Sequence, residues 1–131
     1  MLHAIRTTRR EELVDVTHVV ADAVSASGVA SGIAVVSSPH TTAGILVNEN
    51  ADPNVATDLI AGLASLAPES GGWRHAEGNS DAHLKTALVG TSAILPIEDG
   101  QLALGTWQAV YFAEFDGPRS RHLHVSVVHG L

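Results

Sequence analysis

Three stretches of the chain place apolar residues at helical spacing. In the first, Thr8 and Glu11 fit a capping box, in which a hydroxyl and a carboxylate bond the first amides of a helix. The apolar positions that follow are spaced by three or four residues: Leu13, Val16, Val20 and Val24. We therefore expect a helix from this capping box to about Ser27, ended by Gly28.

The second helix is predicted by Asp52 and Pro53. A carboxylate N-cap followed by proline in the first helical position is a strong helix start. Four residues form its apolar stripe: Val55, Leu59, Leu63 and Leu66. Pro68 ends this helix, because proline removes a backbone donor and clashes with the preceding turn.

A third, shorter helix follows a glycine-containing loop over residues 69–79. Asn79 or Ser80 would cap it, it would cover residues 81–89, and Gly90 would end it. Leu84 and Leu88 lie one turn apart and form its apolar positions.

The other apolar runs are short or alternating, as in strands. The expected strands cover residues 2–7, 32–38, 43–47, 92–97, 101–104, 107–115 and 123–127. Asp99 and Gly100 separate two of them and predict a tight hairpin. The mixed order of helices and strands favours an α+β fold. We expect a two-sheet, mostly antiparallel β-sandwich with two to three helices packed outside, in a single domain over residues 1–131.

The composition narrows the class of protein. Of 131 residues, 45% are apolar and 16% are charged, which is typical of a globular chain. Without cysteine, the chain has no disulfide, cysteine-based zinc site or thiol nucleophile. The net charge of −7 argues against binding to nucleic acid or to an anionic membrane. No run could span a bilayer and no signal peptide opens the chain, so we expect a cytoplasmic protein.

Polar residues gather in three clusters at the ends of the predicted elements, where sites are usually built. The clusters are His40, Thr41, Thr42, Glu49 and Asp52; then Arg74, His75, Asn79, Ser80, Asp81, His83 and Lys85; then Gly105, Thr106, Trp107 and Gln108. Lys85 is the only lysine, and a compact rotatable ammonium suits chemistry that arginine performs less well.

Two kinds of site fit these clusters. A divalent metal, either zinc, manganese or magnesium, would take the imidazoles of His40, His75 and His83, with Glu49, Asp52 or Asp81 as further ligands or orienting groups. A phosphate would take backbone amides at a helix start, hydroxyls and a cation. The residues that could supply these are Asn79, Ser80, Lys85, Arg74, Thr41, Thr42 and Thr106. No histidine pair has the spacing of a helical metal site, so spacing alone gives little support to the metal.

Each candidate also has a structural interpretation. Asp52 serves first as an N-cap, and Asp81 could simply complement the helix dipole. His83 could pack beside Leu84, and Trp107 could belong to a core or an interface. His122 and His124 share a strand face with no acidic residue nearby in sequence, so we expect them to face solvent.

Several ordered motifs resemble the YjbQ-like family, whose members are often labelled secondary thiamine-phosphate synthase enzymes. The motifs are His40-Thr-Thr-Ala-Gly44, Asn48-Glu-Asn-Ala-Asp-Pro53, Arg74-His75, Asn79-Ser-Asp-Ala-His-Leu-Lys85, Asp99-Gly-Gln-Leu-Ala-Leu-Gly-Thr-Trp-Gln108 and Glu114-Phe-Asp-Gly-Pro-Arg119. Together they cover nearly the whole chain from Thr7 onward. The last strand differs from the family pattern, so His122 and His124 are not carried over as site residues.

The resemblance implies a two-sheet sandwich, a homotrimer and a histidine-rich pocket near a subunit interface that binds a divalent metal. It implies weak thiamine phosphate formation, in which a thiazole phosphate nitrogen attacks a pyrimidine diphosphate and releases pyrophosphate. On this basis we expect Glu49, Asp52 and Lys85 to be catalytic, and His40, His75 and His83 to hold the metal. The residues expected to bind the phosphorylated substrate are Thr41, Thr42, Arg74, Asn79, Ser80, Lys85, Gly105, Thr106 and Gln108.

Two other functions remain open at this point. One is a non-catalytic trimeric module that binds a metal or a small anion. The other is a hydrolase of unknown substrate, although no Gly-x-Ser-x-Gly elbow is present in the chain.

Overall fold

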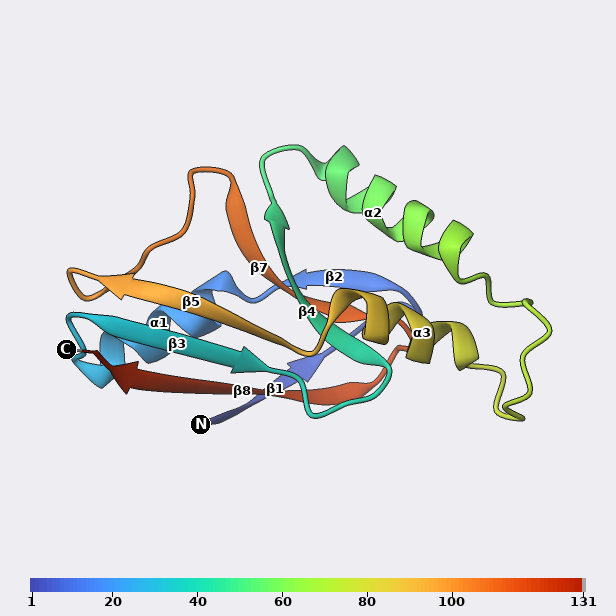
Figure 1. The fold of residues 1–131 in the computed structure, drawn as a ribbon, viewed down its shortest axis with the longest axis horizontal. Coiled ribbons are helices and arrows are strands. Elements are labelled where there is room, and N and C mark those ends of the chain that lie inside the picture. Colours follow the sequence, from blue (N-terminus) through green and yellow to red (C-terminus); the bar gives the residue numbers. More distant parts are fainter. Residues whose placement is uncertain (131) are drawn as a thin grey trace.

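The computed structural model describes residues 1–130, which form two antiparallel sheets and three helices (Figure 1). The predicted domain extends to Leu131, which lies outside the described residues. In chain order the elements are β1 (Leu2–Arg6), β2 (Glu12–Asp15), α1 (Thr17–Ser27), β3 (Gly32–Ser37), β4 (Ala43–Glu49), α2 (Pro53–Leu66), α3 (Ser80–Val89), β5 (Ser92–Glu98), β6 (Gln101–Leu102), β7 (Gln108–Glu114) and β8 (Ser120–His129). The α+β prediction is confirmed.

The two sheets have the orders β1-β8-β3-β5-β6 and β2-β7-β4. All pairings between neighbouring strands are antiparallel. Asp99 and Gly100 connect β5 to β6 with φ values of 51° and 76°. Two consecutive left-handed residues are what a tight hairpin turn of this type needs, so the predicted hairpin is confirmed.

The main core lies between the sheets. Alternate residues of β4 and β7 face it, including Ile45, Val110 and Phe112, and meet Val36, Leu123 and Val125 of the five-stranded sheet. Helix α1 adds its buried face, formed by Val20 and Val24, against the same core. The opposite face of the three-stranded sheet is covered by α3 and α2, where a second cluster contains Ala82, Ala113 and Phe115.

The outer face of the five-stranded sheet carries exposed apolar side chains. Ile94 is 67% exposed, and Leu2, Val128 and Ile33 are exposed as well. His122 and His124 lie on this face and are exposed, as predicted. No helix among residues 1–130 is long and apolar enough to cross a membrane.

The predicted first helix is wrong before Thr17. The amide and hydroxyl of Thr8 bond the carboxylate of Glu12 at 2.8 and 3.0 Å, rather than forming the expected box with Glu11. The segment that follows is a strand, β2, which pairs with β7. Helix α1 begins only at Thr17, whose amide and hydroxyl both donate to Asp15 Oδ1. The sheet pairing of β2 therefore overrides a local capping signal.

The predicted start of α2 is confirmed, because the Asn54 amide donates to Asp52 Oδ1 at 2.9 Å. No residue of α2 is fully buried, and Leu66 is 73% exposed. Figure 1 shows α2 at the margin of the fold, beside α3.

The third helix is confirmed as α3, with Asn79 as its N-cap residue. Its predicted apolar face is wrong, because Leu84 and Leu88 are exposed while Asp81 and Lys85 are buried. This short helix turns its charged residues inward, where each finds a partner of opposite charge.

Candidate functional site

Two adjacent pockets lie along α3 and share His83. The first, which we call the His40 pocket, has a volume of ≈ 380 Å³ and is lined by His40, Thr41, His83, Thr86, Ala87, Gly90 and Thr91. The second, the His75 pocket, has a volume of ≈ 500 Å³ and is lined by Trp73, Arg74, His75, Ser80, His83 and Leu84. Together they form what we call the α3 groove. It brings together residues from three chain segments that the sequence analysis singled out.

The loop that carries His40 is held by Ser38. The Ser38 hydroxyl donates to the Ala43 carbonyl at 2.7 Å and accepts from the His40 amide at 3.2 Å. His40 Nε2 accepts a hydrogen bond from the backbone amide of His122 at 2.9 Å. Its ring meets Phe112 edge-on, at a centroid separation of 6.3 Å. Burial, together with the nearby charge of Arg121, lowers the pKa of His40, so this imidazole is neutral near pH 7.

His75 and His83 face each other across the second pocket. The planes of the two rings meet at 87°, and the ring centroids are 5.5 Å apart. His75 lies on the exposed loop before α3, where its Nε2 is 3.7 Å from a carboxylate oxygen of Glu77. That loop is folded back by Trp73, whose indole donates to the Pro68 carbonyl at 3.0 Å.

The start of α3 adds a positive end to the groove. Asn79 occupies the N-cap position, but its side chain makes no capping bond and instead donates to Asp116 Oδ2 at 2.9 Å. Amides of the first turn therefore lack a side-chain acceptor, and the helix dipole points its positive end toward Ser80 and Arg74. This arrangement suits a negatively charged ligand.

Three expected substrate residues lie beneath the groove rather than in it. Lys85 is only 1% exposed, and its ammonium bonds the carboxylates of Asp81 and Glu11. Thr42 is buried, and its hydroxyl accepts from Arg121 Nη2 at 2.8 Å. Asn79 is the third, bound to Asp116 as described above. These side chains hold the scaffold beneath the groove, and none of them lines it.

Asp81 is the centre of the ion cluster under α3. Arg10 binds it through two nitrogens at 3.1 and 3.0 Å, and Lys85 Nζ approaches it at 2.9 Å. Burial alone would raise the pKa of Asp81, but the hydrogen bonds from Arg10 and Lys85 outweigh burial and lower that pKa. Asp81 therefore fixes α3 against the N-terminal segment, a larger role than complementing the dipole.

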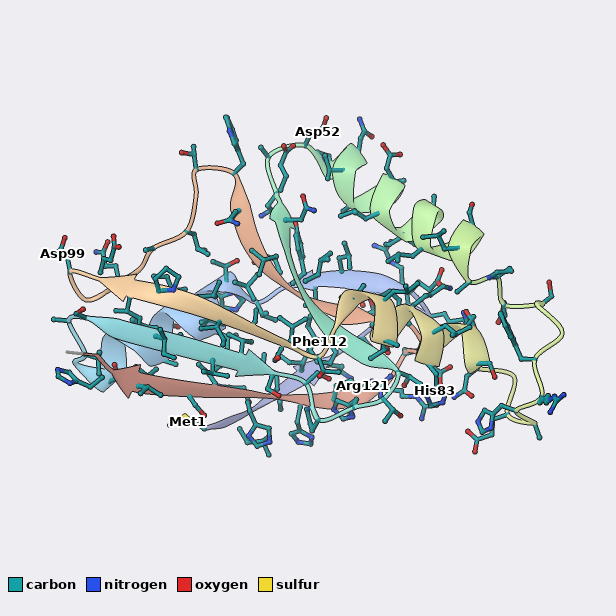
Figure 2. All side chains as sticks on the ribbon, viewed as in Figure 1. Met1, Asp52, His83, Asp99, Phe112 and Arg121 are labelled. Carbon is teal, nitrogen blue, oxygen red and sulfur yellow. The ribbon has the colours of Figure 1, made fainter. Side chains whose placement is uncertain are left out.

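The remaining expected residues lie at the other end of β4. Glu49 and Gln108 are backbone partners there, and Asp52 begins α2. Gln108 uses its side chain to accept from the Gly105 amide at 2.8 Å. Figure 2 shows Asp52 and His83 far apart. Seven residues of β4 separate the two ends, which is about 20 Å of extended chain.

A small polar pocket of ≈ 340 Å³ at that far end contains residues that the sequence analysis missed. Asp15 accepts a hydrogen bond from Asn50 Nδ2 at 2.7 Å. The Tyr111 hydroxyl donates a hydrogen bond to Asn50 Oδ1 at 2.8 Å. Burial raises the pKa of Tyr111, and the nearby charge of Asp15 adds to this effect. Trp107 stands at the rim and is 64% exposed, so it is not a core residue.

A second buried ion pair, also missed, joins the two sheets behind His40. Glu114 is fully buried on β7 and accepts from Nε and Nη2 of Arg121 on β8, at 2.8 and 2.5 Å. Figure 2 labels Arg121 near the middle of the ribbon, close to the strand that carries Phe112. The alternation of β7 was the available signal, because it places Glu114 on the same face as Phe112 and so predicts a buried acid that needs a cation.

Within one chain, residues 1–130 do not bring the three expected histidines together around a single metal ion. No three side chains among the His, Asp and Glu residues of 1–130 converge closely enough to hold an ion. His75 and His83 are neighbours, but the Nε2 lone pair of His40 is occupied by the His122 amide. A zinc site needs at least three protein ligands with free lone pairs.

Comparisons with known proteins agree along the whole chain. A sequence model described as UPF0047 protein YjbQ-like matches residues 2–130. The UPF0047 protein of Methanocaldococcus jannaschii is 53% identical over 126 residues, covering 96% of this chain and 91% of that protein. UPF0047 protein YugU of Bacillus subtilis is 46% identical over 129 residues, covering 95% of each.

Solved structures show the same fold. An uncharacterized conserved protein of the YjbQ/UPF0047 family from Clostridium acetobutylicum superimposes with a TM-score of 0.96 at 48% identity, covering 98% of this chain and 99% of that one. A protein of unknown function from Sulfolobus solfataricus gives a TM-score of 0.95 at 32% identity, covering 99% and 96%.

Proposed function

This chain belongs to the UPF0047 family of YjbQ-like proteins, and we propose that it is an enzyme that acts on a small phosphorylated substrate in the α3 groove. The observation that carries the proposal is the convergence of His40 and His83 on one pocket from separate elements. His75 and Arg74 extend the same surface. Enzyme sites are built in this way, from side chains at element ends around a concave surface.

The proposed reaction is weak thiamine phosphate formation, which the family resemblance implies. A thiazole phosphate nitrogen attacks the methylene carbon of a pyrimidine diphosphate, the carbon–oxygen bond breaks, and pyrophosphate leaves with the bonding electrons. Negative charge builds on the leaving diphosphate, so fixed positive groups lower the barrier. Arg74 and the free amides at the start of α3 are the groups that support this role. The proposed compartment is the cytoplasm, where small phosphorylated metabolites are held.

The test measures pyrophosphate release from a pyrimidine diphosphate and a thiazole phosphate. Purified protein is assayed after EDTA treatment, and again with added zinc, manganese or magnesium. We expect slow release by the wild type and at least a tenfold loss in His83→Ala, with unchanged circular dichroism. His18→Ala is the matched control, because His18 is exposed on α1 and lines neither pocket of the groove, and its rate should equal that of the wild type.

The same assay distinguishes the other functions. A hydrolase would release phosphate from generic phosphoesters without a thiazole acceptor. A non-catalytic binding module would show thermal stabilisation by phosphate or metal but no turnover. Absence of turnover with every substrate pair would contradict the enzyme proposal. Metal analysis of untagged wild type beside His83→Ala tests the expected ion directly.

We also propose that the protein works as a homotrimer, as the resemblance implies. Two features support this. The far end of β4 carries Glu49, Asp52 and the turn over residues 105–108, about 20 Å from the groove of the same chain, so these expected site residues could meet a groove only across an interface between copies. The exposed apolar face of the five-stranded sheet, including Ile94, offers area for association. Native mass spectrometry tests the proposal, and a pure monomer at micromolar concentration would contradict it.

A further inference from the structure

His40 is held so that only one of its ring nitrogens remains for a ligand. Its Nε2 lies 2.9 Å from the backbone nitrogen of His122. A backbone N–H can only donate, so Nε2 must be the acceptor and carries no proton. A neutral imidazole has one N–H, and in this ring it is therefore on Nδ1.

This tautomer decides what the ring can bind. A metal needs a nitrogen lone pair, but the lone pair of Nε2 is engaged and Nδ1 carries the proton. The ring is therefore a hydrogen-bond donor toward any ligand of the pocket.

A second observation in the same pocket points to a ligand independently. Thr86 lines the His40 pocket and is only 3% exposed, yet its Oγ1 has no hydrogen-bond partner among residues 1–130. A buried hydroxyl without a partner costs free energy, and such groups are rare in folded proteins. An oxygen of a bound ligand would satisfy it.

The other lining groups fit an anion. Thr41 and Thr91 contribute hydroxyls, His83 contributes a second imidazole, and no Asp or Glu lines the pocket. Glu114, a carboxylate whose charge acts on His40, is fully buried and paired with Arg121. The pocket thus offers donors without an opposing carboxylate.

We propose that the His40 pocket is an oxyanion site, in which neutral His40 donates through Nδ1–H and the Thr86 hydroxyl completes the binding of a tetrahedral phosphate or sulfate group. The proposal rests on the proposed function, since it names the substrate group that this end of the groove recognises. It also replaces His40 as a metal ligand with His40 as an anion donor.

The test measures binding of inorganic phosphate by calorimetry to the full-length protein in EDTA. Two substitutions separate the roles of the ring. His40→Asn keeps a donor near the Nδ1 position, whereas His40→Ala removes it. A hydrogen bond to a charged group implies about a tenfold to hundredfold loss of affinity in His40→Ala. In His40→Asn the affinity should stay within about threefold of the wild type.

Thr86→Val provides a second test, because it is nearly isosteric and leaves His40 in place. We expect at least about a fivefold loss of phosphate affinity, whereas Thr57→Val, on the exposed side of α2, should cause none. Titration with sulfate in place of phosphate shows whether the site selects between the two anions. Similar affinities assign a general oxyanion site, and a strong preference for phosphate assigns a phosphate site.

Nitrogen NMR of the imidazoles reports the tautomer directly. We expect His40 to show a protonated Nδ1 and an unprotonated Nε2, with a change at Nδ1 when phosphate is added. The opposite tautomer would overturn the proposal. Zinc binding to the wild type that is lost equally in His40→Ala and His40→Asn would also overturn it. So would phosphate affinity that is equal in wild type, His40→Ala and Thr86→Val. Phosphate binding without any turnover would instead contradict only the enzyme function.

Discussion

Replacing Glu114 by glutamine tests how much the buried ion pair contributes to stability. The Glu114 carboxylate accepts four hydrogen bonds: from Thr7 Oγ1 at 2.8 Å, the Asp116 amide at 3.1 Å, and Arg121 Nε and Nη2 at 2.8 and 2.5 Å. It joins β7 of one sheet to β8 and the end of β1 in the other. The substitution keeps the shape but removes the charge and one of the two acceptor oxygens.

The expected magnitude follows from these bonds. Glutamine retains one oxygen for Thr7 and Arg121 Nε, and its amide nitrogen then faces two donors, Arg121 Nη2 and the Asp116 amide. Two lost bonds to a charged group, at about 1.5–2 kcal/mol each, give about 3–4 kcal/mol. This agrees with the cost of about 3–5 kcal/mol for breaking a buried ion pair on one side.

The assay is urea denaturation at fixed protomer concentration and pH 7, because association would make the stability concentration-dependent. Glu98→Gln, at an exposed position of β5, is the matched control and should change the free energy of unfolding by less than about 0.5 kcal/mol. A loss below about 1 kcal/mol for Glu114→Gln, with an unchanged denaturant slope, would refute the reasoning.

Acid titration gives a second signature of the same pair. Burial alone would raise the pKa of Glu114, but the hydrogen bonds from Arg121 and Thr7 outweigh it and lower that pKa. The folded state therefore binds the proton less readily than the unfolded state. The pair stabilises the protein above the unfolded carboxyl pKa of about 4.3, and this contribution is lost as the pH falls through the lower folded value. The wild type should converge toward Glu114→Gln in acid.

Four further substitutions concern β4, α2 and α3. Gly44→Ala should destabilise the fold by about 1–3 kcal/mol, because a Cβ there would lie 2.4 Å from a backbone oxygen at the end of α3. Gly62→Ala, with nothing within 4 Å of its Cβ and a position inside α2, should instead stabilise by up to about 1 kcal/mol; chemical denaturation of both variants checks the pair. Asp81→Asn removes the anion shared by buried Lys85 and partly exposed Arg10. It should cost about 3 kcal/mol, the lower end of the range for breaking a buried ion pair, because Lys85 keeps Glu11 and Arg10 keeps Glu69 as partners; a change under about 1 kcal/mol, measured in the same way, would count against the ion cluster as an anchor of α3. Asp52→Ala should cost about 1 kcal/mol and act locally, seen as faster amide exchange in α2 while the core amides keep their protection.

The candidate site was partly visible in the sequence. His40, His75, His83 and the helix start at Ser80 do gather around one groove, and their positions at element ends were the signal. Lys85 shows the limit of that reasoning. A lone lysine in a polar motif suggested phosphate binding, but its partners Asp81 and Glu11 are brought to it by the fold, and they bury it. Nothing in the local sequence states which charged residue will meet which.

The sequence by itself determined the features that depend on residues close together in the chain. The hairpin at Asp99 and Gly100 and the start of α2 at Asp52 rest on local backbone preferences and short-range hydrogen bonds, so both were predicted correctly. The alternation along β7 likewise identified a strand with two usable faces.

Only the tertiary structure decided the rest. Thr8 and Glu11 carry a capping signal, yet the chain forms β2, because pairing with β7 and burial against the sheet outweigh one local cap. The pairing of Glu114 with Arg121 joins strands of different sheets. The tautomer of His40 depends on an amide of β8. Each of these is set by contacts between residues distant in sequence, and such contacts exist only once the two sheets have packed together.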